Sequence, residues 1–241
     1  MAVLVCREID RFTAVLRENG FDVINLPMIR TERLHDLTDF REKLDHIDDY
    51  ECILITSRNS AEALLEIGGP GFKFSGTIYV LGERSRALLN GGRFKLNYSK
   101  SANTITELIK ELGTEEFAGK RLLFIRGRMS LRTIPQLLGS IAKIDEAEVY
   151  DTLSLSIKAE TRVAITEMIE SGEIGWVCFF SPSAIEAFVD VFGSPESLKV
   201  AAIGTTTADA ARSHSFNVGF VADTATAEGF GKGFSKYLRE H

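Results

Sequence analysis

Several features that mark whole classes of protein are missing from this 241-residue chain. No apolar run approaches the roughly 20 residues that a membrane-spanning helix needs. The first residues, MAVLVCREID, meet charged side chains before the core of a signal peptide could form. Low-complexity tracts are absent too, and a composition of 44% hydrophobic and 26% charged residues is ordinary for a globular protein. We therefore expect a cytoplasmic protein with a substantial buried core and no membrane partner.

Cysteine and histidine are scarce, and neither is spaced for metal binding. The three cysteines stand inside apolar runs, VLVCR, ECILI and WVCFF, without a CxxC pair or a nearby histidine. This context predicts buried, reduced thiols. The four histidines lie far apart along the sequence in polar contexts. We expect neither a metal site nor a Ser-His-Asp triad.

A basic excess and a nucleotide fingerprint are missing as well. The net charge is −6, whereas a general nucleic-acid binder normally has a basic surface, so we expect no nucleic-acid partner. The glycine run GFGKG at 229–233 lies within a terminal helical pattern and does not open a helix after a strand, so it predicts no phosphate-binding loop. Any anionic ligand must therefore be held by local groups.

What the chain does contain is a regular alternation of short apolar runs with longer amphipathic stretches. Because the runs are continuously apolar, they predict parallel strands covered by helices on both faces, which is the α/β class. The length suits two domains. We predict two flavodoxin-like, doubly wound parallel-sheet lobes of five strands each. The expected strands are 2–6, 22–26, 52–56, 77–81, 94–98, 121–125, 144–150, 176–180, 199–203 and 217–221.

The chain also repeats part of itself. The stretch CILITSRNSAEAL at 52–64 resembles CFFSPSAIEAF at 178–188. Such matches predict an internal duplication at a spacing of about 121 residues, far longer than the period of a solenoid repeat. The residues matched in order are Arg7 with Arg126, Ser57 with Ser181, Gly82 with Gly204, Phe94 with Phe216, and Glu107 with Glu228.

The repeated junctions combine glycine, hydroxyl and basic residues. ITSRNS, LGERS, FSPSA and IGTTT all follow predicted strands, and ligands bind at the carboxyl ends of the strands in open α/β sheets. For each serine or threonine taken singly, a helix N-cap is the simpler interpretation. Four helix N-termini from two facing lobes would together form an anion-binding cleft. The cations assigned to this edge are Arg7, Arg58, Arg84, Arg86, Arg126, Arg128 and Lys199.

Two polar segments, 26–36 and 151–160, are candidates for crossings between the lobes. Tyr150, in EAEVYDTLS, directly precedes the second and would then face the cleft. A tyrosine phenol is a neutral hydrogen-bond donor at pH 7. The alternative interpretation is a tyrosine that packs at a lobe boundary.

In their order and spacing, nine segments of the sequence resemble the uroporphyrinogen-III synthase family, and together they extend over essentially the whole chain. The sequence departs from the family's usual pattern at Cys6, where threonine commonly precedes the arginine, and at Thr205, where proline commonly follows AIG. The matching pieces are VLVCRE, NGFDVINLPMIRTE, YECILITSRNSAEAL, YVLGERSRALL, KRLLFIRGR, EVYDT, WVCFFSPSAIEAF, KVAAIGTTTADAA and ATAEGF.

The resemblance implies a fold and a reaction. The chain would cross twice between lobes, so that 1–33 and 158–241 form a discontinuous lobe one and 36–153 forms lobe two. The implied substrate is hydroxymethylbilane, a linear tetrapyrrole with eight carboxylates. It would be cyclised with loss of water and inversion of the last ring, without a metal or organic cofactor. The alternatives are an inactive synthase-like binding or regulatory protein for an anionic ligand and an unrelated two-lobed binding protein.

The resemblance also implies roles for particular residues. Tyr150 matches the tyrosine that donates a proton to the leaving hydroxyl, and Thr206 and Thr207 match paired threonines that meet the substrate. The expected partner is the polyanionic tetrapyrrole. Transient contact with neighbouring pathway enzymes stays open, and a monomer is expected because no apolar patch is evident. The expected substrate-binding set is Arg7, Ser57, Arg58, Asn59, Gly82, Arg126, Ser181, Ser183, Lys199, Gly204, Thr206 and Thr207.

Overall fold

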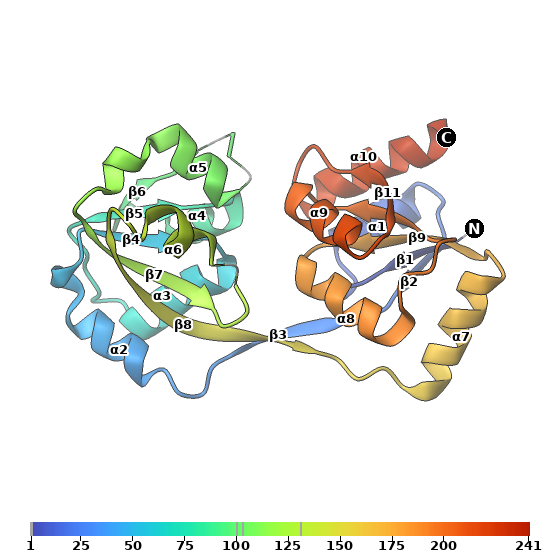
Figure 1. Ribbon diagram of the computed structural model, residues 1–241, viewed down its shortest axis with the longest axis horizontal. Coiled ribbons are helices and arrows are strands. Elements are labelled where there is room, and N and C mark those ends of the chain that lie inside the picture. The colour runs from blue at the N-terminus through green and yellow to red at the C-terminus, as the bar shows by residue number, and fades with distance from the viewer. Residues whose placement is uncertain (1, 100, 103, 131) are drawn as a thin grey trace. The chain divides into compact units, whose positions relative to one another are not determined.

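The computed structural model describes residues 2–99, 101–102, 104–130 and 132–241. The chain divides into two compact units, each with its own sheet and covering helices (Figure 1). Unit 1 consists of Met1–Arg30 and Leu153–His241, and unit 2 consists of Thr31–Thr152. The chain therefore passes between the units twice, and unit 1 is discontinuous in sequence.

The sheet of unit 1 has five strands in the order β11-β10-β9-β1-β2, and every neighbouring pair is parallel. Val5 lies opposite Cys178, and Cys178 lies opposite Ala201. This register brings the carboxyl ends of the three central strands to one edge. The strands are β1 (Ala2–Val5), β2 (Val23–Asn25), β9 (Ile174–Phe179), β10 (Lys199–Ala202) and β11 (Asn217–Val221).

Helices cover both faces of this sheet because its strands are apolar on both sides. Along β1, Leu4 faces a core with Phe188 and Phe216, while Val3 and Val5 face a second core. The first core includes residues of α7, α8 and α9, and the second includes residues of α1 and α10. The glycine run at 229–233 lies inside α10, as predicted. These helices are α1 (Arg11–Glu18), α7 (Ala159–Glu170), α8 (Pro182–Phe192), α9 (Thr205–Ser213) and α10 (Ala227–Glu240).

The sheet of unit 2 has six strands in the order β3-β8-β7-β4-β5-β6. From β8 to β6 every neighbouring pair is parallel, so this part is the α/β arrangement that the apolar runs predicted. The prediction of five strands was wrong for this unit. Its strands are β3 (Ile29–Arg33), β4 (Cys52–Ile55), β5 (Thr77–Val80), β6 (Lys95–Asn97), β7 (Arg121–Gly127) and β8 (Lys143–Ser154).

The unexpected strand is β3, which lies within the segment 26–36. The Leu34 N–H donates to the Val149 carbonyl at 3.2 Å, and the Leu155 N–H donates to the Met28 carbonyl at 2.8 Å. These two bonds pair the ends of β3 and β8 in opposite directions, so β3 runs antiparallel to β8. Its sequence, IRTER, is polar and mostly exposed because β3 is an edge strand. A search for apolar runs could not find it.

Helices cover both faces of the second sheet as well. Leu123 and Ile125 face a core with α2, α3 and α4, while Leu122 and Phe124 face one with α5, α6 and η2. Because successive residues of β7 face the two cores in turn, every residue of this part of the strand has to be apolar. The helices are α2 (Thr38–Asp45), η1 (Ile47–Asp49), α3 (Arg58–Gly68), α4 (Glu83–Leu89), α5 (Ile105–Leu112), η2 (Thr114–Phe117) and α6 (Thr133–Leu138).

The cysteines are free thiols and buried, as predicted. Burial raises the pKa of Cys52 to about 12 and raises the pKa values of Cys6 and Cys178 well above the ordinary thiol value. No group of histidine, cysteine and acidic residues in the described part of the chain could hold a metal ion. Among the described helices, none has the length and apolarity needed to cross a membrane.

Candidate active site

Two of the predicted junctions are helix N-caps made by serine. Ser57 caps α3, and its Oγ accepts a hydrogen bond from the Ser60 N–H at 3.1 Å. Ser181 caps α8 and accepts from the Ala184 N–H at 3.3 Å. Its Oγ also lies 3.1 Å from the Ser183 Oγ. The cap interpretation therefore holds for both serines, and each cap uses one N–H that a ligand could otherwise bind.

The other two junctions are capped by glycine, which offers no side-chain acceptor. Gly204 is the N-cap of α9 in an extended conformation, and Gly82 is the N-cap of α4 with a φ of 86°. That positive φ favours glycine. In the described part of the chain, the N–H groups of 205–207 and 83–85 have no hydrogen-bond acceptor. Both helix starts therefore keep their free donors and positive dipole ends for an anion or for water.

The threonines that follow Gly204 differ in exposure. Thr205 and Thr206 are exposed, whereas Thr207 is only 4% exposed. The expectation that both Thr206 and Thr207 present hydroxyls is therefore corrected for Thr207, whose side chain packs inside unit 1. Thr206 is the member of the pair whose hydroxyl reaches the surface beside the free N–H groups.

Arg7 lies at the same edge of the unit 1 sheet, two residues after the end of β1. Its guanidinium carbon lies 4.2 Å from the centroid of the Phe180 ring, and its Nη2 lies 3.3 Å from Asp10 Oδ2. The Asn25 Nδ2 group donates to the Arg7 carbonyl at 3.1 Å and to Thr13 Oγ1 at 2.9 Å. These supporting residues were not predicted from the sequence. Only Asp10 carried a local signal, because an aspartate directly before an amphipathic helix is a typical N-cap.

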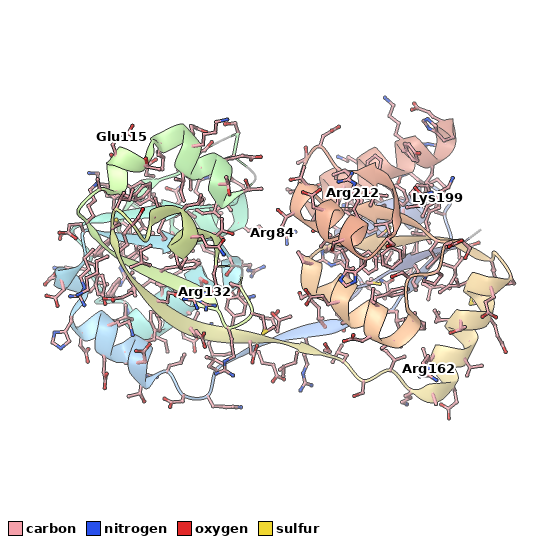
Figure 2. The ribbon with its side chains drawn as sticks, in the orientation of Figure 1. Arg84, Glu115, Arg132, Arg162, Lys199 and Arg212 are labelled. Atoms are coloured by element: carbon pink, nitrogen blue, oxygen red, sulfur yellow. The ribbon has the colours of Figure 1, made fainter. Side chains whose placement is uncertain are left out.

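Lys199 does not belong to this edge, and its assignment there was wrong. It is the first residue of β10 and lies opposite Trp176, with its Nζ 5.7 Å from the ring centroid (labelled in Figure 2). In a parallel sheet, the residue that begins a strand lies at the edge opposite to the loops that follow the strands. Arg7 and Lys199 are thus at opposite edges of one sheet.

In unit 2, the basic residues around α3 and α4 are exposed or engaged in local pairs. The Arg58 Nε donates to Glu62 Oε1 at 2.7 Å, and the Arg86 Nε donates to Glu83 Oε2 at 2.8 Å. Such exposed pairs contribute little to stability and can be broken by an anionic ligand. Arg84 is exposed at the start of α4 and has no ion pair with any described residue (Figure 2). Asn59, the second residue of α3, is half-buried.

Arg126 was expected to meet a ligand, but its charge is neutralised inside unit 2. The side chain lies on β7 and the residue is 7% exposed. Its Nε lies 2.5 Å from Glu146 Oε2, and its Nη2 lies 3.4 Å from Glu148 Oε1. Its Nη1 donates to the carbonyls of Gly127 at 2.8 Å and Arg128 at 2.9 Å. The expectation of substrate binding by Arg126 is therefore corrected to an internal role.

Tyr150 lies at the carboxyl edge of the same sheet. It is half-buried on β8 and lies opposite Gly127, the last residue of β7. A Cβ atom placed on Gly127 would come within 2.5 Å of the tyrosine Cζ and 2.9 Å of its hydroxyl oxygen. The phenol ring therefore rests directly on the glycine backbone. Its hydroxyl makes no hydrogen bond to the described residues, so the donor remains available.

The opposite edge of the unit 2 sheet holds a polar cavity with a different character. Arg121 Nη2 lies 2.7 Å from Asp145 Oδ2, which also accepts from the Tyr50 hydroxyl at 3.0 Å. Arg121 Nη1 pairs with Asp49 at 3.2 Å. Because these groups satisfy one another, the cluster is structural. The cavity measures about 340 Å³ and is lined by Asp39, Glu42, Lys43, His46, Asp49, Tyr50, Arg121 and Asp145.

Comparisons with known proteins agree with one another. The family model described as uroporphyrinogen-III synthase HemD matches residues 10–231. A uroporphyrinogen-III synthase from Chlorobaculum parvum is 32% identical over 136 residues, which cover 55% of this chain and 54% of that protein. The match thus spans about half the length of this curated relative.

Solved structures resemble the fold over the full chain. A mutant uroporphyrinogen III synthase from Thermus thermophilus has a TM-score of 0.71 at 16% identity and 100% coverage of both chains. The uroporphyrinogen-III synthetase from Helicobacter pylori has a TM-score of 0.63 at 16% identity, with 100% of this chain and 99% of that one covered. At these identities the likeness concerns the fold, and it confirms the predicted α/β class with parallel sheets.

Proposed function

The chain belongs to the uroporphyrinogen-III synthase family, and we propose that it cyclises hydroxymethylbilane to uroporphyrinogen III. The reaction would remove one water and invert the terminal pyrrole ring. The observation that carries this proposal is the pair of glycine-capped helix starts, α4 in unit 2 and α9 in unit 1. Each leaves a turn of backbone N–H groups without an acceptor among the described residues.

These helix starts suit a flexible ligand with many carboxylates. A helix N-terminus carries roughly half a positive charge, and its N–H groups bind carboxylates without a cationic side chain. Hydrogen bonds to a charged acceptor are stronger than those between neutral groups. Thr206 adds an exposed hydroxyl, and Arg7 and Arg84 add charge at the two edges. In a protein with a net charge of −6, such local donors would attract a polyanion.

The two units are proposed to be the two lobes of an internal duplication, with lobe one formed by 1–33 and 158–241 and lobe two by 36–153. A shift of about 121 residues relates the strand order β2-β1-β9-β10-β11 to β8-β7-β4-β5-β6. The same shift relates the serine caps at Ser57 and Ser181 and the glycine caps at Gly82 and Gly204. Matching strand order and matching caps support a duplication followed by divergence, and the proposed crossings run through β3 and β8.

Tyr150 is proposed to supply the proton in the first chemical step. The electron-rich pyrrole pushes out the terminal hydroxyl, so the C–O bond breaks and water leaves with the proton. A weak acid suffices, because the pyrrole provides most of the driving force. General acid help of this kind contributes about 10²–10⁴-fold. The half-buried phenol at the edge of the unit 2 sheet, with no competing hydrogen bond to the described residues, supports this role.

The remaining contribution of the protein to catalysis would be to hold the terminal pyrrole ring in the right position for ring closure. The terminal ring must be attacked at its substituted carbon, which forms a spiro intermediate before the ring is inverted. Holding the reacting carbons in contact can contribute as much as the acid does. The reaction is redox neutral, and the proposal includes no metal or organic cofactor.

The protein is further proposed to act as a cytoplasmic monomer, with contacts to neighbouring pathway enzymes left to experiment. Support for the monomer comes from the large exposed apolar side chains, which are spread over separate elements. These are Ile9, Leu88, Tyr98, Met129, Leu137, Leu153 and Val163.

One assay tests the function directly. The protein is incubated with enzymatically generated hydroxymethylbilane, the products are oxidised, and the type I and type III isomers are separated. We expect type III to predominate, whereas a heat-denatured sample should give type I. A native sample that binds the bilane and yields only type I would support the inactive, ligand-binding alternative.

A further inference from the structure

Arg126 occupies a position where the sheet would ordinarily have an apolar residue. Leu122 and Phe124 lie on the same face of β7, and both are buried in one core cluster. Arg126 is the next residue on that face and is buried as well. Burying an ion pair is costly, and a well-packed apolar residue often does as well or better for stability. Stability alone therefore does not explain an arginine there.

The guanidinium holds the end of β7 through its backbone. Nη1 of Arg126 donates to the carbonyls of both Gly127 and Arg128. The Gly127 N–H donates to Ser130 Oγ at 3.0 Å, and the Ser130 N–H donates back to the Gly127 carbonyl at 3.1 Å. Gly127 is thus fixed at both its N–H and its carbonyl.

The strand register changes at the same place. Arg126 lies opposite Glu148, but Gly127 lies opposite Tyr150, so Val149 is passed over. An irregularity of this kind re-aims the side chain beside it. Here it places the phenol ring on Gly127, in the space that a Cβ atom would fill. The Arg128 N–H donates to the Tyr150 carbonyl at 2.9 Å, so the backbone of Tyr150 is bonded to the residue that follows Gly127.

We infer that Arg126 is a positioning residue, which sets the Tyr150 hydroxyl for proton donation by fixing the Gly127 backbone beneath the phenol ring. The inference rests on the proposed function, because the proton-donor role of Tyr150 belongs to it. Glu146 and Glu148 hold the guanidinium, and the guanidinium holds the glycine. Arg126 touches no substrate in this scheme.

The matching arginine of the other unit is used differently. Arg7 stacks on Phe180, and its side chain is 29% exposed. It therefore lacks the buried setting of Arg126. The buried arrangement occurs in the unit that carries Tyr150, as expected if it serves that tyrosine.

The first test is kinetic. Arg126→Lys keeps a positive charge beside Glu146 but loses the planar fork that reaches two carbonyls. We expect kcat for type III formation to fall about tenfold while KM changes less than about twofold. The matched control is Arg132→Lys. The exposed Arg132 pairs with the same Glu146 at 2.7 Å but makes no bond to Gly127, so kcat should stay near the parental value.

A double-mutant cycle separates positioning from a general structural effect. If Arg126 acts through Tyr150, then Arg126→Lys should cost almost nothing further in a Tyr150→Phe background. Independent, multiplicative losses would overturn the inference. Gly127→Ala provides a second route, because its methyl group must displace the ring. It should lower kcat about as much as Tyr150→Phe, and a near-parental Gly127→Ala would also overturn the inference.

A spectroscopic readout works whether or not the protein is a synthase. The chain has five tyrosines, and ring ¹³C labelling gives each of them an NMR signal. The signal that disappears in Tyr150→Phe is that of Tyr150. Arg126→Lys should shift or broaden the Tyr150 signal, while Arg132→Lys should leave it in place. An unmoved Tyr150 signal in Arg126→Lys contradicts the positioning role. A moved signal in a protein that makes no type III product supports the positioning and rejects the proposed function.

Discussion

The Tyr150 hydroxyl is the single group to which the proposed chemistry assigns a proton transfer. Its ring rests on Gly127, which makes three hydrogen bonds with Arg126 and Ser130 through its N–H and carbonyl, and Arg126 donates a further hydrogen bond to the Arg128 carbonyl. A weak acid works only if it is well placed, because the geometry must do what acid strength does not. At the residue scale, the proposed function therefore depends on the hydroxyl and on the glycine beneath it.

Tyr150→Phe removes this hydroxyl and keeps the ring. We expect kcat to fall by about 10²-fold or more, because the donor is lost, with little change in melting temperature or in bilane binding. Slow turnover must then compete with spontaneous closure, so type I product should predominate. A bilane whose leaving group needs no proton is the control and should be cyclised almost as well by the variant. Parental rates with the natural substrate would leave Tyr150 a packing residue.

The cluster of Arg121, Asp145 and Tyr50 at the opposite edge of the unit 2 sheet should make the stability of the protein depend on pH. Burial acts to raise the pKa of Asp145, but hydrogen bonds from Arg121 and Tyr50 outweigh it and lower that pKa. Burial and the hydrogen bond to Asp145 raise the pKa of Tyr50 to about 12. The aspartate therefore stabilises the fold above its unfolded pKa, and this contribution is lost as the pH falls. The tyrosine contribution is lost between about pH 10, the ordinary value, and pH 12.

Asp145→Asn should remove the acid-dependent part of this stability. Urea unfolding from pH 7 down to about pH 2 should show a shallower loss of stability for the variant than for the parent, because protonating Asp145 no longer breaks an ion pair. Asp48→Asn is the control, since the exposed Asp48 makes no hydrogen bond or ion pair to the described residues. Equal pH profiles for the parent and Asp145→Asn would contradict the account of the cluster.

At the scale of the element, the four helix N-termini at the predicted junctions divide into two kinds. Ser57 and Ser181 close the starts of α3 and α8, whereas Gly82 and Gly204 leave the starts of α4 and α9 open. A serine cap favours the helix, and a glycine cap is nearly as stable but keeps the donors for a ligand. The open starts are the elements proposed to bind carboxylates.

Gly204→Asp tests the open start of α9. Gly204 has an extended backbone and nothing lies within 4 Å of an added Cβ, so aspartate fits without strain. A carboxylate at the cap should stabilise the helix by a few tenths of a kcal/mol while it occupies the N–H groups and repels an anion. We expect KM to rise about tenfold with an unchanged or higher melting temperature. Gly204→Asn, an uncharged cap of the same size, should raise KM less, and equal KM values for both variants and the parent would reject binding at α9.

Elements could be predicted from the sequence where the signal was local. The ten apolar runs all became strands, and the serines before amphipathic stretches became caps. The strand β3 could not be found, because an exposed edge strand is held by backbone bonds to β8 and needs no apolar pattern. The burial of Arg126 was equally hidden, because its partners Glu146 and Glu148 come from a neighbouring strand. Lys199 shows a third limit, since a charge near a strand joins the site only if it follows that strand.

At the scale of the whole molecule, two units of matching strand order share one chain. The chain passes between them only within β3 and β8. Units connected in this way are expected to move relative to one another unless a large apolar interface joins them. A ligand with eight carboxylates, bound by helix starts of both units, would then change how the units are arranged.

Solution scattering can detect this change. We expect the radius of gyration of the protein to differ between the free state and a state saturated with a tetrapyrrole such as the reaction product, because a ligand held by both units restricts their motion. Gly204→Asp is the matched control, since weakened binding at α9 should reduce the difference at the same ligand concentration. Superimposable profiles at saturation would contradict binding by both units.

The most direct test of the proposed function is the isomer composition of the product as a function of protein concentration. Spontaneous closure of hydroxymethylbilane competes with the enzyme at a fixed rate, so the type III fraction reports how much substrate the protein captures. The fraction should rise with concentration until almost all of the product is type III, and Tyr150→Phe should need far more protein to reach the same fraction. A product that stays type I at every concentration of folded protein would contradict the assignment of synthase activity.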